Sequence, residues 1–241
     1  MKKIRVSLAF SLLFFALNLH AYQNDELKQI EAVLMTILHD NADFVRQHNH
    51  AYFEKFAKHQ HPRATVVTCA DSRVHDQALE HAPDNDLFIV RNIGNQIYTA
   101  EGSVEYGVHH LHTPLLLIIG HSACGAIKAA GGDFSHESEP IKRELATIKL
   151  SHAIDPDNDQ EVMEGVKMNV NHQVDFARKK FSRDVKAHRL MIVGAVYDFT
   201  NIMHQGEGRL TIVNVDGNSH PKYVKNALDK MKQHILAIKN H

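Results

Sequence analysis

The 241-residue sequence has no tryptophan, only two cysteines and no excess of charge of either sign. Its 27 lysines and arginines balance 28 acidic residues, so the chain has no overall positive field that would attract nucleic acid or anionic lipid. It also lacks internal repeats and low-complexity tracts. The 44% hydrophobic and 23% charged composition is typical of a folded soluble protein and excludes disordered and collagen-like chains. Histidine is abundant, with 20 residues, which makes metal or proton chemistry worth a search.

The first 21 residues have the layout of a secretory signal peptide. Three cations in the segment MKKIR precede an apolar run over residues 6–17, and Ala21 is a small residue at the expected cleavage site. The run is shorter than the ~20 apolar residues of a spanning helix. We therefore expect an exported bacterial protein in the periplasm, with no stable membrane anchor. Removing residues 1–21 takes away three cations and no acidic residue, which changes the formal net charge from −1 to −4. We expect the remaining residues, 22–241, to form one α/β domain.

Nearly continuous apolar runs of strand length indicate strands buried on both faces of a parallel sheet. A further run, residues 210–215, alternates in polarity after a polar loop, and we expect it to pair antiparallel at a sheet edge. The fold class is therefore α/β: a mainly parallel sheet of about four strands plus an antiparallel edge strand, flanked by helices, with a long N-terminal helix. The four apolar runs are 64–69, 87–92, 114–122 and 189–198, and the helical patterns cover 25–46, 51–58, 99–112, 161–178 and 223–238.

Potential metal ligands follow two of these strands. Cys69 ends the first, whereas His121 lies at the end of the third and Cys124 follows within one turn of chain. Ligands of open α/β sheets bind beyond the carboxyl ends of the strands. Two thiolates and an imidazole suit zinc, and three protein ligands leave an open fourth position, as in catalytic zinc sites. The alternative for an exported chain is a disulfide between Cys69 and Cys124, although a disulfide would not need the nearby histidine.

Asp71 and Arg73 follow Cys69 at alternate positions, which share one face of an extended backbone. Asp71 therefore has two possible roles. It either binds the metal itself, as the fourth ligand of a resting state, or is held off the metal by a charge-assisted bond to Arg73.

The segments Cys69–Arg73 (CADSR) and Gly120–Gly125 (GHSACG) together resemble the paired zinc signature of the β-class carbonic anhydrases. Three further segments match that family, so the resemblance covers most of the chain after residue 21. They are residues 91–95 (RNIGN), 103–107 (SVEYG) and 196–198 (VYD). The subtype that the sequence resembles is the plant-like, type I-like one.

The resemblance implies one Zn²⁺ per subunit, held by Cys69, His121 and Cys124. It implies a carbonate dehydratase: hydroxide formed on the zinc ion would add to carbon dioxide and give bicarbonate and a proton. In this scheme Asp71 orients the nucleophile and Arg73 keeps the carboxylate ionised. The substrate pocket, transferred position by position, falls on Gln60, Phe88, Ile93, Tyr106 and Gly125.

The resemblance also implies a homodimer or a higher homo-oligomer, in which the N-terminal helix lies across a partner subunit and the pocket is shared. Two departures from the family pattern stand out. Gly107 replaces the usual alanine, and Val66 stands where members with an allosteric bicarbonate site have tryptophan. Although Arg91 would match the arginine of that site, the missing tryptophan favours the permanently open subtype.

Two other functions stay open on sequence grounds. The same scaffold could hydrolyse carbonyl sulfide or carbon disulfide, because nothing near the predicted pocket excludes these substrates. The protein could instead be a non-catalytic zinc-binding or anion-binding exported module. Asp71, Arg73 and the open fourth position favour an enzyme over such a module.

Overall fold

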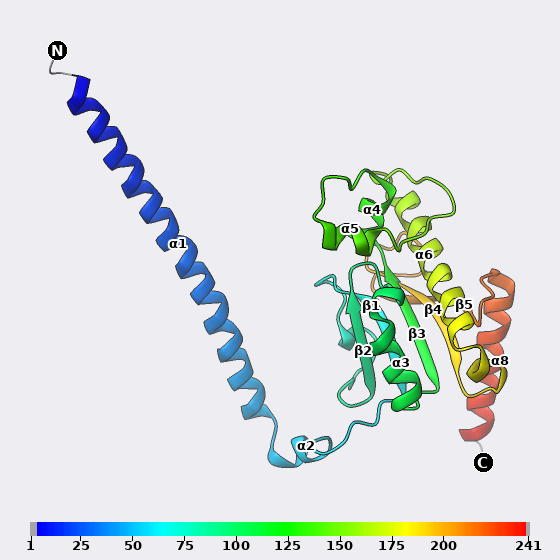
Figure 1. Ribbon diagram of the computed structural model, residues 1–241. Helices are drawn as coiled ribbons and strands as arrows, with labels where there is room; N and C mark the ends of the chain where they lie inside the picture. Colours follow the sequence, from blue (N-terminus) through cyan, green and yellow to red (C-terminus); the bar gives the residue numbers. More distant parts are fainter. Residues whose placement is uncertain (1–3, 240–241) are drawn as a thin grey trace. The chain divides into compact units, whose positions relative to one another are not determined.

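The computed structural model describes residues 4–239, and the side chains of residues 25–237. It has two compact units, residues 1–59 and 60–241 (Figure 1). The predicted targeting segment, residues 1–21, lies outside the residues whose side chains are described. In the part of the chain searched, no helix combines the length and the apolar character needed to cross a membrane.

The first unit consists of the long helix α1 (Ile4–Gln47) and the short helix α2 (His50–Glu54). The helix predicted over 25–46 is therefore confirmed. Its apolar stripe is open to solvent, with exposed fractions of 52% to 66% at Leu27, Ile30 and Ile37. An amphipathic helix normally covers such a stripe by packing, so α1 presents a surface suited to a protein contact.

The second unit contains a five-stranded sheet of the predicted class. Its order is β2-β1-β3-β4-β5, in which the first four strands run parallel and β5 pairs antiparallel with β4 at one edge. The antiparallel edge expected from the sequence is therefore confirmed. The strands are β1 (Ala64–Cys69), β2 (Leu87–Asn92), β3 (Leu115–His121), β4 (Met191–Asp198) and β5 (Arg209–Val215).

The main helix of this unit is α6 (Asp159–Lys180), which packs closely on the middle of the sheet. Glycines make the close approach possible. A Cβ on Gly120 would lie 2.6 Å from Val166 Cγ1, and a Cβ on Gly194 would lie 2.7 Å from Val170 Cγ1.

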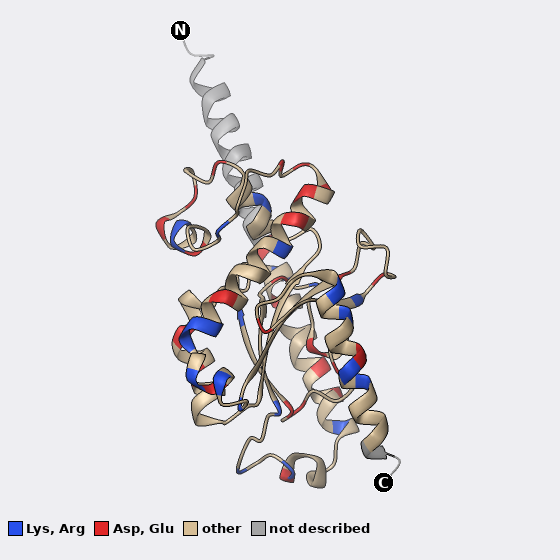
Figure 2. Cartoon of the chain, turned by 90° about the vertical axis from the view of Figure 1, so that its right-hand side faces the viewer, with Lys and Arg blue, Asp and Glu red and all other residues tan. Residues whose placement is uncertain are grey.

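Figure 2 shows basic and acidic residues mixed along the helices, in agreement with the near-zero net charge.

The helix predicted over 99–112 is interrupted. It consists of the 3-10 turn η2 (Tyr98–Ala100), α3 (Glu101–Glu105) and the π-helix η3 (Tyr106–His110). Gly107 in η3 lies against β1, where a Cβ would collide with the Thr65 side chain. The structure therefore gives a packing reason for the glycine that replaces the family's usual alanine.

Three short helices were not predicted, because five to seven residues carry too little periodicity to be recognised. They are α4 (Gly125–Gly131), α5 (Glu139–Leu145) and α7 (Ser182–Lys186). The C-terminal helix α8 (Pro221–Lys239) is confirmed, with a start two residues earlier than predicted. Of these helices, α4 bears on function because it begins directly after Cys124.

Candidate metal centre

Cys69, His121 and Cys124 meet at the carboxyl ends of neighbouring parallel strands. Cys69 is the last residue of β1, His121 is the last residue of β3, and Cys124 immediately precedes α4. One ligand atom from each lies within 4.8 Å of the other two. The three residues are buried, with exposed fractions of 4%, 0% and 1%. Both cysteines are free thiols, so the structure contradicts the disulfide alternative.

The turn between β3 and α4 depends on Ala123. Its φ of +52° lies in the left-handed region, which costs an L-residue roughly 1 kcal/mol. This conformation lets the chain reverse direction, so that His121 and Cys124 face the same point. It also directs the carbonyl oxygen of Ala123 toward Arg73 Nη2, which donates to it at 3.2 Å.

The imidazole of His121 is arranged as a metal ligand. Its Nδ1 donates to the carbonyl oxygen of Ser122 at 2.9 Å, which leaves the lone pair on Nε2. That Nε2 atom is buried and has no hydrogen-bond partner among the described residues. A buried polar atom without a partner is costly, and a cation bound there would satisfy it.

The two thiols shift each other's pKa in opposite directions. The hydrogen bond between them lowers the pKa of Cys69 to about 4, and the same bond together with burial raises the pKa of Cys124 well above its usual value. The backbone N–H of Gly94 donates to Cys69 Sγ at 3.4 Å and further favours the thiolate. A divalent cation favours the deprotonated form of both thiols, so this donor set of two sulfurs and one imidazole fits zinc.

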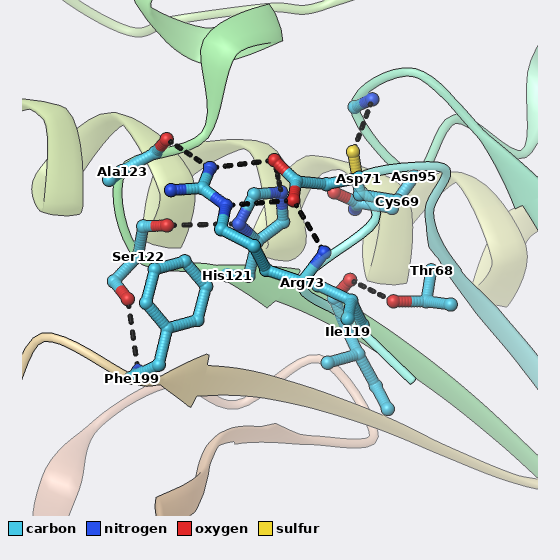
Figure 3. A network of polar contacts seen from close by, with 12 residues as sticks. Thr68, Cys69, Asp71, Arg73, Asn95, Ile119, His121, Ser122, Ala123 and Phe199 are labelled. Atoms are coloured by element: carbon cyan, nitrogen blue, oxygen red, sulfur yellow. Dashed lines mark hydrogen bonds and ion pairs between the residues drawn. The ribbon is translucent and has the colours of Figure 1, made fainter. Parts of the chain in front are cut away.

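Beside the three ligands, Asp71 is paired with Arg73. Arg73 Nε donates to Asp71 Oδ1 at 2.9 Å and Nη2 donates to Oδ2 at 2.7 Å, while the backbone N–H of Arg73 donates to Oδ1 at 2.9 Å (Figure 3). These bonds hold the pKa of the Asp71 carboxyl well below its usual range, against a smaller effect of burial. Asp71 Oδ2 lies 3.8 Å from His121 Nε2. The carboxylate is therefore ionised and next to the metal position, with its oxygens turned to Arg73.

Phe199 belongs to this site, although the sequence did not indicate it. The Arg73 guanidinium carbon lies 4.7 Å from the centre of the Phe199 ring, and the same ring stacks on His121 at 5.9 Å between centres. The Phe199 N–H donates to Ser122 Oγ at 3.1 Å, which joins the end of β4 to the metal-binding turn (Figure 3). The one available signal was its place directly after the matched segment 196–198.

The predicted pocket residues are not all gathered at this site. Ile93 packs against the core that contains both cysteines, and Gly125 is the first residue of α4 beside Cys124. Phe88, by contrast, is four residues before the end of β2 and pairs with Thr65 rather than with Cys69.

Four residues of strand span about 13 Å, so Phe88 lies well away from the metal ligands. Its ring contacts that of Tyr106 at 5.9 Å between centres, and Tyr106 is 43% exposed. Gln60 is exposed at the start of the second unit. Within one chain, these three residues do not line the metal centre.

Comparison with known proteins gives consistent results. The family model described as carbonic anhydrase matches residues 64–210. A carbonic anhydrase of Synechococcus elongatus is 41% identical over 83 residues, which are 32% of this chain and 30% of that protein. One of Mycolicibacterium smegmatis is 45% identical over 71 residues, which are 29% of this chain and 34% of that protein. The chain therefore matches about a third of the length of these relatives.

Two solved structures share the fold over most of the chain. A tetrameric β-carbonic anhydrase from Sordaria macrospora superposes with a TM-score of 0.63 at 21% identity, covering 78% of this chain and 98% of that one. The Coccomyxa β-carbonic anhydrase in complex with acetazolamide superposes with a TM-score of 0.61 at 25% identity, covering 75% and 84%. The family match spans more than half of the chain and includes all three metal-site residues. This chain is a member of the β-class carbonic anhydrase family.

Proposed function

We propose that this protein catalyses the reversible hydration of carbon dioxide to bicarbonate and a proton, with one Zn²⁺ held by Cys69, His121 and Cys124. The observation that carries the proposal is the buried group of three ligand atoms directly beside an ionised, arginine-paired carboxylate. When bound, zinc supplies the Lewis acidity that activates water at neutral pH.

Asp71 has the acceptor atoms that orient the attacking water. Because Arg73 holds the carboxylate in a fixed, ionised state, Asp71 accepts a hydrogen bond without first having to lose a proton. Arg73 is itself anchored to the carbonyl of Ala123 and to the Phe199 ring. If the pair with Arg73 breaks, Asp71 becomes free to take the open metal position, as in the resting state considered from the sequence.

The substrate side of the site combines an apolar wall with a polar donor. Ile93 provides apolar surface next to the cysteines, which suits a small nonpolar gas. The backbone N–H of Gly125, at the first position of α4, has no partner within its own helix and can donate to a substrate oxygen.

The pocket is completed by a second copy of the chain in this proposal. Phe88, Tyr106 and Gln60 do not reach the metal centre of their own chain, and the apolar stripe of α1 is exposed. Both observations support a homodimer as the smallest active unit. Sedimentation equilibrium of the full chain tests this, and a monomer at micromolar concentration would contradict it.

The function is tested by stopped-flow hydration of carbon dioxide with the zinc-loaded full chain. We expect catalysis that disappears when a chelator removes the metal and returns when zinc is added. The metal-loaded protein should shield both thiols, and chelation with denaturant should release one zinc and two reactive thiols per chain. A fully zinc-loaded protein that does not accelerate hydration would sink the proposal and leave the two alternatives, a carbonyl sulfide or carbon disulfide hydrolase and a non-catalytic zinc module.

Phe199→Leu is expected to lower kcat/KM for hydration about 5-fold to 30-fold while one zinc per chain is retained. The change removes the contacts of the aromatic ring with Arg73 and His121, which are worth roughly 1–2 kcal/mol together. Phe176→Leu is the matched control, because Phe176 is partly buried on α6 and its ring contacts Tyr98. Equal activities of the two variants would show that the Phe199 ring has no role at the site.

A further inference from the structure

A groove separate from the metal centre lies between α6, β5 and α8. Both helices contact β5 at this edge of the sheet (Figure 1). The groove has a volume of about 700 Å³, within the range of roughly 300–1,000 Å³ that is usual for small-molecule sites. It shares no residue with the metal centre, and most of the residues that line it follow residue 210, where the family match ends.

The floor of the groove is apolar. Val213 of β5 packs against the core beneath α6, and Val224 of α8 is buried. The apolar lining is completed by one residue each from α6, α8 and the loop before β5, namely Met168, Leu228 and Met203. An aliphatic chain placed on this floor would lose contact with water along most of its length.

The length of the groove limits what can occupy it. It follows α8 from Pro221 to Lys232, which is roughly 16 Å of helix. Even at the width of a whole helix, about 10 Å, a strip of this length has far less area than the ~800 Å² per partner of a standard protein interface. The groove therefore fits a small elongated molecule rather than a folded protein.

The charged side chains around the groove leave one lysine unmatched. Three lysines and two acidic residues belong to the lining, which gives it a net charge of +1. Lys167 Nζ lies 2.5 Å from a carboxylate oxygen of Glu164. Lys232 Nζ lies 4.0 Å from one of Asp229. Lys225 is exposed and forms no ion pair among the described residues, so the groove is complementary to a molecule with one negative charge.

Lys225 and Met203 lie toward opposite ends of the groove. β5 runs from the loop that carries Met203 to the turn that leads into α8, and Lys225 is near the start of that helix. The side-chain bond from Asn214 Nδ2 to Asn171 Oδ1, at 2.7 Å, fixes α6 beside the same end of β5. The unmatched charge is therefore at one end, and the apolar floor extends away from it.

We propose that this groove binds an aliphatic carboxylate of the fatty-acid class, with its carboxylate at Lys225 and its chain directed toward the loop that carries Met203. Burial of the chain supplies most of the affinity, and the lysine selects the sign of the head-group charge. This is a second ligand site, and it does not depend on the reaction proposed for the metal centre.

Laurate is the probe, titrated by calorimetry into the zinc-loaded full chain below its micelle concentration. We expect saturable binding of one laurate per chain. From octanoate to laurate the affinity should rise by about threefold to fourfold for each added CH₂, because each one buries more apolar surface. Dodecyltrimethylammonium, which has the same chain and a cationic head group, should show no saturable binding.

Lys225→Gln is expected to weaken laurate binding about threefold to fivefold, because it removes an exposed charge contact. Lys222→Gln is the matched control. Lys222 is exposed on the same helix and does not line the groove, so its substitution should leave the laurate affinity unchanged.

The absence of tryptophan from the chain allows a local reporter. Gln205→Trp places a single indole in the lining, at the loop end of the groove, in place of an exposed side chain. The bromine of 12-bromododecanoate quenches indole fluorescence on contact, and the quenching should follow the calorimetric binding curve. Tyr223→Trp is the control, because Tyr223 is exposed on α8 outside the lining, and it should be quenched no more than free tryptophan.

Three results would overturn the site. They are laurate binding that does not saturate, equal laurate affinities of Lys225→Gln and Lys222→Gln, and equal quenching of the two tryptophans. If laurate does not bind and Lys225→Gln instead changes the mass in sedimentation equilibrium, the groove is a contact between copies of this chain and the proposal is wrong.

Discussion

Cys124→Ser is expected to abolish zinc binding at stoichiometric zinc and to lower kcat/KM for hydration roughly 10³-fold or more. The substitution removes one of two thiolate ligands, and a buried serine hydroxyl neither ionises at neutral pH nor offers a soft donor. The remaining Cys69 and His121 would form a two-ligand site, which is too few for a stable zinc centre. The measurements are zinc per chain after gel filtration and stopped-flow hydration.

Ile127→Val serves as the control for Cys124→Ser. Ile127 is buried in α4, three residues after Cys124, and packs in the same core cluster. Removing one methylene there should cost about 1 kcal/mol of stability and leave the zinc content at one per chain. A Cys124→Ser protein that keeps one zinc per chain and activity within about tenfold would refute the ligand assignment.

Asp71→Asn is expected to lower kcat/KM about 10²-fold with zinc retained. The amide has the shape of the carboxyl group but carries no charge, so Arg73 loses its bidentate ion pair and the water-orienting acceptor weakens. Since the three candidate ligands are unchanged, the zinc content should stay at one per chain. The loss of kcat/KM should come mainly from a lower kcat. Asp76→Asn is the matched control, because Asp76 lies on the nearby exposed turn and accepts from Gln77 N–H. Equal activities of the two variants would contradict the role of Asp71.

The same ion pair sets a pH dependence with a definite sign. Arg73 holds the pKa of Asp71 below its value in the unfolded chain. The stability that the pair contributes is therefore fully present above the unfolded pKa, near 3.9, and is lost as the pH falls through the lower folded value. The contribution of Asp71 to the free energy of unfolding, measured on the metal-free protein as the difference from Asp71→Asn, should consequently stay constant between pH 5 and 8, and a contribution that disappears within that range would count against the pairing.

Much of the fold could be predicted from the sequence because the strands contain short continuous apolar runs. β1 is buried along its whole length, and its bounds, 64–69, were predicted without error. The edge strand β2, 87–92, was also placed without error, although it is only partly buried. The interruption of the helix at Tyr106 was less visible. A π-helix changes the hydrogen bonding of the backbone while leaving the apolar pattern nearly intact, so periodicity alone does not detect it.

The candidate metal site could be predicted from the sequence only in part. A metal site at Cys69, His121 and Cys124 could be proposed from the sequence because the carboxyl ends of parallel strands lie at one edge of a sheet. Thiolate and imidazole groups are also ligands that suit zinc. Phe199 could not be predicted, because an aromatic ring has many structural uses and is not a metal ligand. Its role depends on the residues that it contacts.

By itself, the sequence determined the class of the fold, the three candidate metal ligands and the candidate partnership of Asp71 with Arg73. All of these follow from local spacing, from strand periodicity or from motif resemblance. Only the tertiary structure decided between the disulfide and free thiols, turned Asp71 toward Arg73, and joined Arg73 to Ala123 and Phe199. The physical reason is that these contacts join residues far apart in the chain, such as 50 positions for Arg73 and Ala123. Such contacts exist only once β1, β3 and β4 have brought their carboxyl ends to one edge of the sheet.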